Sequence, residues 1–166
     1  MMEIHTKVSY GGNGIYEISN ICSKTIDGTT KQFCVLTPLH GDDAIIYVPV
    51  ESEELMSRMH QLMTAEEAKC LIRLMPSTET DWIEDEKMRG IYEKSVLSSG
   101  DRMALVRMTK SLYEQKQMLA AKGKRLRAFD AQALKQGENK LFGELSVVLQ
   151  IEQDQVLQCI QDMLAE

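Results

Sequence analysis

The fold is decided by the stretch Lys7-Val-Ser-Tyr-Gly-Gly-Asn-Gly-Ile-Tyr-Glu-Ile-Ser-Asn-Ile-Cys22, in which two alternating runs flank a glycine-rich turn. Alternation of apolar and polar residues is typical of half-buried strands, so both runs predict β-strands. A hairpin signal, Ile26-Asp-Gly-Thr29, follows, and residues 31–37 and 44–50 read as two further strands. Four or five short strands joined by tight turns favour a small, strongly bent antiparallel β-barrel.

The last of these strands is expected at an edge of the sheet. Pro49 has no amide hydrogen to donate to a neighbouring strand, so it must lie at an edge or at a strand end. An exposed edge can pair with a strand of another protein.

The hydrophobic period becomes helical after residue 52. Thr64-Ala-Glu-Glu67 has the form of a capping box, and apolar residues follow it at three- and four-residue spacing up to Pro76. We therefore predict an α+β protein of two domains, a β-barrel at residues 1–55 and a compact five-helix domain at residues 56–166. The five helices are expected at residues 64–75, 81–96, 101–121, 129–150 and 152–164.

The only tryptophan, Trp82, stands in the stretch Thr78-Glu-Thr-Asp-Trp-Ile-Glu-Asp-Glu-Lys-Met-Arg89. Thr80 and Asp81 can accept hydrogen bonds from free amide groups, and acidic residues follow them, so the stretch predicts the start of a helix. Trp82 would then lie in the first turn. From there its ring could fold into the core or stand out as a contact residue.

Composition limits the ways in which this chain could bind nucleic acid. It has 166 residues, of which 43% are apolar and 27% charged, and a net charge of −6. That charge argues against a protein that coats nucleic acid by electrostatics alone, so any DNA contact must be local. Residues 102–127 hold eight basic residues and one acidic residue. This basic stretch could be a solvated helix face and loop, or it could contact phosphates.

Catalytic and metal-binding patterns are not found. Gly11-Gly-Asn-Gly14 lacks the lysine and the strand-to-helix context of a phosphate-binding loop, and the three histidines have no partners at metal or catalytic-triad spacing. The four cysteines are scattered, which is typical of reduced structural thiols. We therefore expect no enzyme activity, no metal, no cofactor and no small-molecule substrate.

The expected location is the cytoplasm, without membrane association. No apolar run approaches the length needed to cross a bilayer, and the first six residues lack the basic and apolar parts of an export signal.

An ordered set of short motifs resembles the CarD/CdnL family of bacterial transcription factors over nearly the whole chain. In the N-terminal part the motifs are Lys7-Val-Ser-Tyr-Gly-Gly-Asn-Gly14, Ile18-Ser-Asn-Ile21, Lys24-Thr-Ile-Asp-Gly28, Phe33-Cys-Val-Leu36, Gly41-Asp42 and Val48-Pro-Val-Glu51. In the C-terminal part they are Asp81-Trp82, Ser99-Gly-Asp101, Leu112-Tyr113 and Leu141-Phe-Gly-Glu-Leu145.

The resemblance implies a Tudor-like barrel, similar to SH3 barrels, that binds the β subunit of RNA polymerase through an edge strand with flanking basic side chains. On this chain the corresponding residues are Lys24, Ile26, Ile46, Tyr47, Val48 and Pro49. It also implies that the helical domain reaches promoter DNA at the upstream edge of the melted region, where Trp82 wedges into the minor groove. A bacterial protein of this kind would be nucleoid-associated through the polymerase. The DNA-contacting residues would be Trp82, Lys87, Arg89, Lys122, Lys124, Arg125 and Arg127.

The sequence differs from the family where basic residues usually follow the tryptophan, because Glu84, Asp85 and Glu86 stand there. The phosphate contacts could have moved to Lys87, Arg89 and the basic stretch, or DNA contact could be weak or lost. Three hypotheses follow. The chain regulates the open promoter complex, or it binds polymerase without touching DNA, or it is a Tudor-type reader. In the third case aromatic rings would cage a cationic side chain, the candidates being Tyr10, Tyr16, Phe33 and Tyr47.

Overall fold

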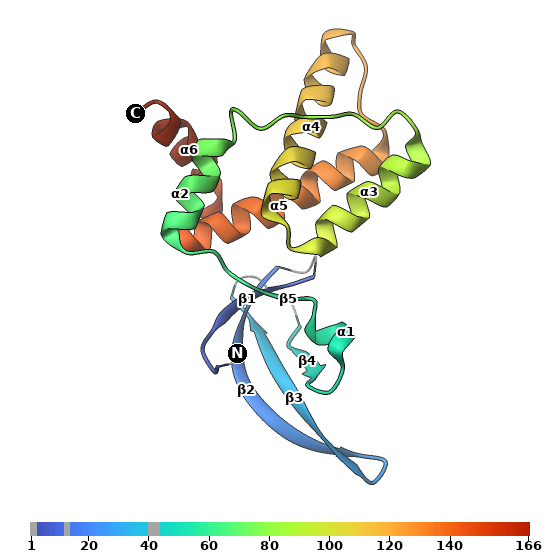
Figure 1. Ribbon diagram of the computed structural model, residues 1–166, viewed down its shortest axis with the longest axis vertical. Coiled ribbons are helices and arrows are strands. Elements are labelled where there is room, and N and C mark those ends of the chain that lie inside the picture. The colour runs from blue at the N-terminus through green and yellow to red at the C-terminus, as the bar shows by residue number, and fades with distance from the viewer. Residues whose placement is uncertain (1–2, 12–13, 40–43) are drawn as a thin grey trace. The chain divides into compact units, whose positions relative to one another are not determined.

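The chain folds as an α+β protein, which a computed structural model describes at residues 3–11, 14–39 and 44–166. The described residues form one five-stranded antiparallel sheet, six α-helices and one short 3-10 helix (Figure 1). They divide into two compact units, Met1–Leu62, here called the sheet unit, and Met63–Glu166, here called the helical unit.

The sheet has the strand order β4-β3-β2-β1-β5. Its strands are β1 (Lys7–Tyr10), β2 (Ile15–Ile26), β3 (Thr29–Pro38), β4 (Ile46–Pro49) and β5 (Met59–Gln61). No pairing joins β4 to β5 among the described residues, so the sheet has an edge at each of these strands. Its closure into a Tudor-like barrel stays a prediction.

The long hairpin of β2 and β3 follows from the sequence between them. Asp27 and Gly28 both adopt positive φ angles, 51° and 78°, which are the conformations of a two-residue turn that matches strand twist. From that turn the two strands stay paired back to Tyr16 and Pro38, with one irregularity between Ile18 and Asn20. The turn end of the hairpin is exposed, and Figure 1 shows it extending beyond the shorter strands of the sheet unit.

The structure adds two short elements between the last predicted strand and the first predicted helix. α1 (Glu53–Met56) is a single turn capped by Ser52, and β5 pairs with β1 by placing Gln61 opposite Val8. Because β5 completes the sheet, the boundary between the compact units falls after Leu62, later than the predicted domain boundary at residue 55. A three-residue strand carries too little alternation to be recognised from sequence.

The helical unit consists of α2 (Ala65–Leu74), α3 (Glu86–Ser99), α4 (Arg102–Ala121), α5 (Ala128–Leu149), η1 (Gln153–Gln155) and α6 (Val156–Leu164). The predicted capping box is confirmed, because the Thr64 hydroxyl accepts from the Glu67 amide at 3.1 Å and the Glu67 carboxylate accepts from the Thr64 amide at 2.7 Å. α5 packs against α2, α3, α4 and α6, and is therefore the central helix of the unit.

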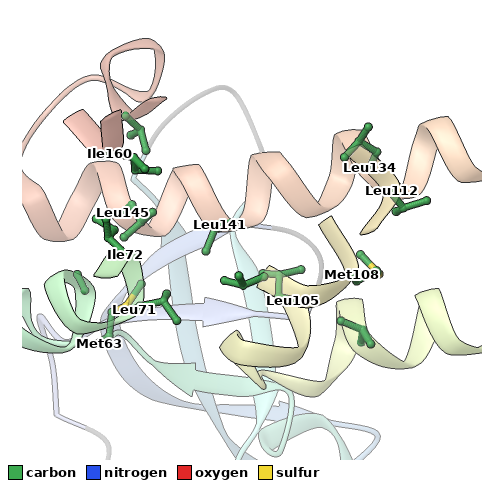
Figure 2. Packing of buried hydrophobic residues seen from close by; sticks show 14 of the residues in the cluster. Met63, Leu71, Ile72, Leu105, Met108, Leu112, Leu134, Leu141, Leu145 and Ile160 are labelled. Carbon is green, nitrogen blue, oxygen red and sulfur yellow. The ribbon is translucent and has the colours of Figure 1, made fainter. Parts of the chain in front are cut away.

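The core of the helical unit is built from the apolar faces of these helices. Figure 2 shows the buried side chains of Met63, Leu71, Ile72, Leu105, Met108, Leu112, Leu134, Leu141, Leu145 and Ile160. The sheet unit has a separate small core, made by Val8, Tyr10, Tyr16, Ile18, Cys34, Leu36 and Val48. Each unit thus buries its own apolar residues.

The predicted start of the helix at Asp81 is wrong. α3 begins at Glu86, and its N-cap is Asp85, whose carboxylate accepts from the Met88 amide at 2.9 Å. The residues before Asp85 are extended and cross α4 (Figure 1). Asp85 is as good a cap as Asp81, and side chains of α4 hold the preceding backbone away from helical geometry.

Candidate functional site

The edge strand β4 has one free side in the part of the chain that the structure describes. It pairs with β3 in the register Cys34↔Val48 and Val35↔Tyr47. The Val50 amide donates to the Gln32 carbonyl at 3.0 Å, and in an antiparallel pair such bonds alternate along the strand. The backbone N–H and C=O of Tyr47 therefore point away from β3, where a further strand could pair with them.

Lys24 and Tyr47 meet on the surface of the sheet. The Lys24 ammonium nitrogen lies 3.7 Å from the centre of the Tyr47 ring, within the range of a cation–π contact. Tyr47 is 46% exposed and Ile26 is 50% exposed, so an apolar surface adjoins a positive charge. These three predicted contact residues are all accessible.

The other predicted contact residues of the sheet unit are less accessible. Val48 is 1% exposed and belongs to the core, so its side chain cannot touch a partner and only its backbone could contribute. Ile46 and Pro49 are half-buried, and the Pro49 carbonyl already accepts from the Ser52 amide at 3.1 Å. Tyr47 is thus the main contact residue that β4 offers.

Trp82 lies in the extended segment between α2 and α3, half-buried, with its ring against the core of the helical unit. Three side chains of α4 hold this segment. Lys110 donates to the carbonyls of Met75, Pro76 and Thr78 at 2.8–3.0 Å, Ser111 donates to the Asp81 carbonyl at 2.7 Å, and Thr80 donates to Glu114 at 2.7 Å.

Arg89 is buried inside the helical unit, where its side chain forms a structural ion pair. It is 6% exposed and forms a two-pronged ion pair with Asp130, whose distances are 2.8 and 2.7 Å. The hydrogen bond to Asp130 is the main cause that raises the pKa of Arg89, so its charge is permanent and already paired. The expectation that Arg89 contacts phosphate does not fit this position, because a phosphate would have to replace a buried carboxylate.

The basic stretch does come together with the tryptophan. Trp82 lines an open depression of about 360 Å³ with Lys124, Arg125 and Arg127. Glu84 and Glu86 line the same depression, and Glu86 pairs with Arg127 at 2.7 Å. Two further predicted DNA contacts, Lys87 and Lys122, are exposed but are not among its lining residues.

The sheet unit is similar to a known domain family. Residues 2–60, a little over a third of the chain, match the family described as the CarD-like/TRCF RID domain. These residues are therefore similar to a CarD-like RID domain, and they are called the RID domain below. Domains of this family interact with the β subunit of RNA polymerase. No curated protein gives a significant match to the chain.

The RID domain does not form an aromatic cage from the predicted rings. Tyr10, Tyr16 and Phe33 are 6%, 3% and 8% exposed, and Tyr10 and Tyr16 belong to the core of the sheet unit, whereas Tyr47 alone is exposed. A cage for a cationic side chain needs several rings that converge on one open pocket. The only cation over Tyr47 in the described part of this domain is its own Lys24.

Sequence reasoning missed Glu93, a buried acid outside the RID domain. Glu93 is 3% exposed, and neither carboxylate oxygen has a hydrogen-bond partner among the described residues. Burial raises the pKa of Glu93 to about 8, and the neighbouring Asp130 carboxylate adds to the rise while Arg89 opposes it. Its position four residues after Arg89 on a helix is the only sequence signal that could have indicated it.

Two further kinds of feature are absent from the described residues. No group of three or more histidine, cysteine, aspartate or glutamate side chains could hold a metal ion there. None of the described helices is both long enough and apolar enough to span a membrane.

Proposed function

We propose that this protein is a transcription regulator that binds the RNA polymerase β subunit through its RID domain and stabilises or tunes the open promoter complex. Trp82 acts as the minor-groove wedge at the upstream edge of the melted DNA. The observation that supports binding to the polymerase β subunit is the family match over residues 2–60. The protein would accompany the polymerase on the nucleoid.

The polymerase contact is assigned to the outward side of β4. Tyr47 offers a backbone donor and acceptor there, and Lys24 and Ile26 add a positive charge and an apolar side chain nearby. Addition of a strand to an edge gives affinity through main-chain hydrogen bonds and specificity through adjacent side chains.

The DNA contact is assigned to the depression beside Trp82. An indole has the large apolar surface that a wedge requires, and an apolar wedge stabilises an unstacked base step in a bent duplex. Lys124 and Arg125 lie at the same depression and are exposed, so phosphates can reach them. Tethering through the polymerase raises the local concentration of DNA and makes weak intrinsic affinity sufficient.

Trp82→Ala tests this assignment. The variant should bind the polymerase β subunit as the natural protein does, because the RID domain is untouched, and should shorten the lifetime of the open complex on a promoter fragment. The matched control is Tyr113→Ala, which removes an exposed ring of α4 that does not line the depression. An unchanged lifetime for Trp82→Ala, with β binding retained, would contradict the wedge.

A second candidate is a polymerase-binding module without DNA contact. The acidic residues Glu84 and Glu86 at the Trp82 depression favour this candidate, because their negative charge repels phosphate. Glu86 also already forms an ion pair with Arg127. Under this candidate Trp82→Ala and the natural protein give equal open-complex lifetimes.

A further inference from the structure

Besides the side chains of α4, one buried side chain of α3, Arg89, holds the extended segment that carries Trp82. The Arg89 guanidinium carbon lies 4.4 Å from the centre of the Trp82 ring, and the same group donates to the Ile83 carbonyl at 2.9 Å. Arg89 therefore fixes both the ring and the backbone next to it. A planar guanidinium can stack and donate at the same time, which a lysine ammonium cannot.

The position of Arg89 is in turn fixed by Asp130 of α5. Both oxygens of Asp130, which is 1% exposed, accept from Arg89. The ion pair thus links the central helix of the unit to the Trp82 segment through one guanidinium. Such a two-pronged pair has a defined geometry, so it transmits the position of α5 to the ring.

Glu93 is the third charged group of this cluster. It lies one helical turn beyond Arg89, lines a small cavity of about 10 Å³ together with Trp82 and Arg89, and faces Asp130. The other polar groups that line this cavity are Asp81, Tyr92 and, from α4, the uncharged Ser111. An ionised Glu93 would place two buried carboxylates against one guanidinium, whereas a protonated Glu93 leaves Asp130 and Arg89 as a balanced pair and can donate to Asp130.

We propose that Arg89 is the positioning residue for Trp82, and that a proton held by Glu93 keeps Arg89 in that position. When Glu93 loses its proton, Arg89 is drawn between two carboxylates, and its contacts with the Trp82 ring and the Ile83 carbonyl weaken. The Trp82 segment then becomes looser. The placement of the ring does not depend on the proposed function, but the effect of that placement on promoter DNA rests on it.

The emission of Trp82 tests the proposal directly, because Trp82 is the only tryptophan. In the full chain, emission should shift to longer wavelength as the pH rises through about 8, the pKa of Glu93, since a looser ring meets more water. Glu93→Gln keeps the shape of the side chain but cannot ionise, so the shift should be lost and the emission should keep its low-pH wavelength. Glu84→Gln, which neutralises an exposed acid near the same ring, should retain the shift.

Three results would overturn the role of Glu93. They are a natural protein without a shift, a shift that persists in Glu93→Gln, and a shift that disappears in Glu84→Gln. Far-ultraviolet circular dichroism at each pH separates loosening of the segment from unfolding.

Arg89→Lys tests the positioning role separately. Lysine keeps a charge beside Asp130 but loses the stacking plane and the fork that reaches the Ile83 carbonyl. Emission at low pH should move to longer wavelength and acrylamide quenching should increase, while circular dichroism stays unchanged. Emission and quenching equal to those of the natural protein would refute the role of Arg89. Neither experiment contains DNA or polymerase, so its failure would leave the proposed function standing, and the reverse also holds.

Discussion

Arg89 and Glu93 lie one turn apart on α3 and are both buried, but among the described residues only Arg89 has an ion-pair partner at hydrogen-bonding distance. Burial therefore affects the charge of the two side chains differently. Arg89 has a carboxylate at hydrogen-bonding distance, and the hydrogen bond to Asp130 raises its pKa by more than burial lowers it, so Arg89 stays charged inside the fold. Glu93 has no such partner, and burial keeps it neutral up to a pH of about 8. The same environment therefore holds one permanent charge and one titratable proton.

Stability should depend on pH through Glu93. The pKa rises from 4.5, its ordinary value, to about 8 in the folded protein, so between these values the folded state binds more protons than the unfolded state. The free energy of unfolding should therefore fall as the pH rises through this window, by at most about 1.4 kcal/mol per pH unit for one proton. Urea unfolding at several pH values would measure the slope. Glu93→Gln should flatten it, whereas Glu84→Gln, at an exposed site, should not.

For binding a partner strand, the position of β4 at the edge of the sheet matters more than its side chains do. Its residues alternate between the core and the outside, which is why Val48 is sealed and Tyr47 is exposed. The free backbone of Tyr47 exists only because no described strand lies beyond β4 in the sheet. Any partner strand must use these backbone groups first.

Tyr47→Pro separates backbone pairing from side-chain contact. Proline removes the outward amide but no hydrogen bond to β3, so the sheet should remain folded while binding to the polymerase β subunit falls. Tyr47→Leu also removes the ring over Lys24 but keeps the amide, so it should weaken binding less than Tyr47→Pro does. Titration calorimetry against a β fragment gives both values. Equal losses in the two variants would exclude strand pairing.

The segment between α2 and α3 is held to α4 chiefly by Lys110, which donates to three carbonyls. Lys110→Met keeps the length of the side chain but leaves those carbonyls without this donor, so we expect a loss of about 1–3 kcal/mol in the free energy of unfolding. Lys116→Met, at an exposed position of the same helix, should change it little. Chemical unfolding of both variants under the same conditions provides the comparison.

The elements that sequence predicts well are those specified by nearby residues. Alternation specifies β2 and β3, the Asp27-Gly28 turn joins them, and Thr64 with Glu67 starts α2. The extended course before α3 could not be predicted, because Lys110 and Ser111, far along the chain, impose it. The same holds for the site. Trp82 and the basic stretch are visible in sequence, whereas the burial of Arg89 depends on Asp130, which no local pattern reveals.

Over the whole chain, each unit has its own core and carries one half of the proposed function. The charge of −6 makes strong DNA binding by the free protein unfavourable, and the residues around Trp82 include acids as well as bases. Contact with promoter DNA would therefore depend on the RID domain bringing Trp82 to the duplex. In such an arrangement the two units act in series and their effects are not independent.

This dependence predicts non-additive substitutions. The Lys24→Ala, Tyr47→Ala double variant should weaken β binding and shorten the open-complex lifetime, because Trp82 is then no longer delivered to the DNA. Adding Trp82→Ala to that background should cause little further loss, although the same substitution alone shortens the lifetime. Two contacts that acted independently would instead give losses that add. Open-complex lifetimes for the four proteins, at a protein concentration near the dissociation constant of the natural complex, distinguish the two cases. At saturating protein the double variant should recover its effect through mass action, and Trp82→Ala should not.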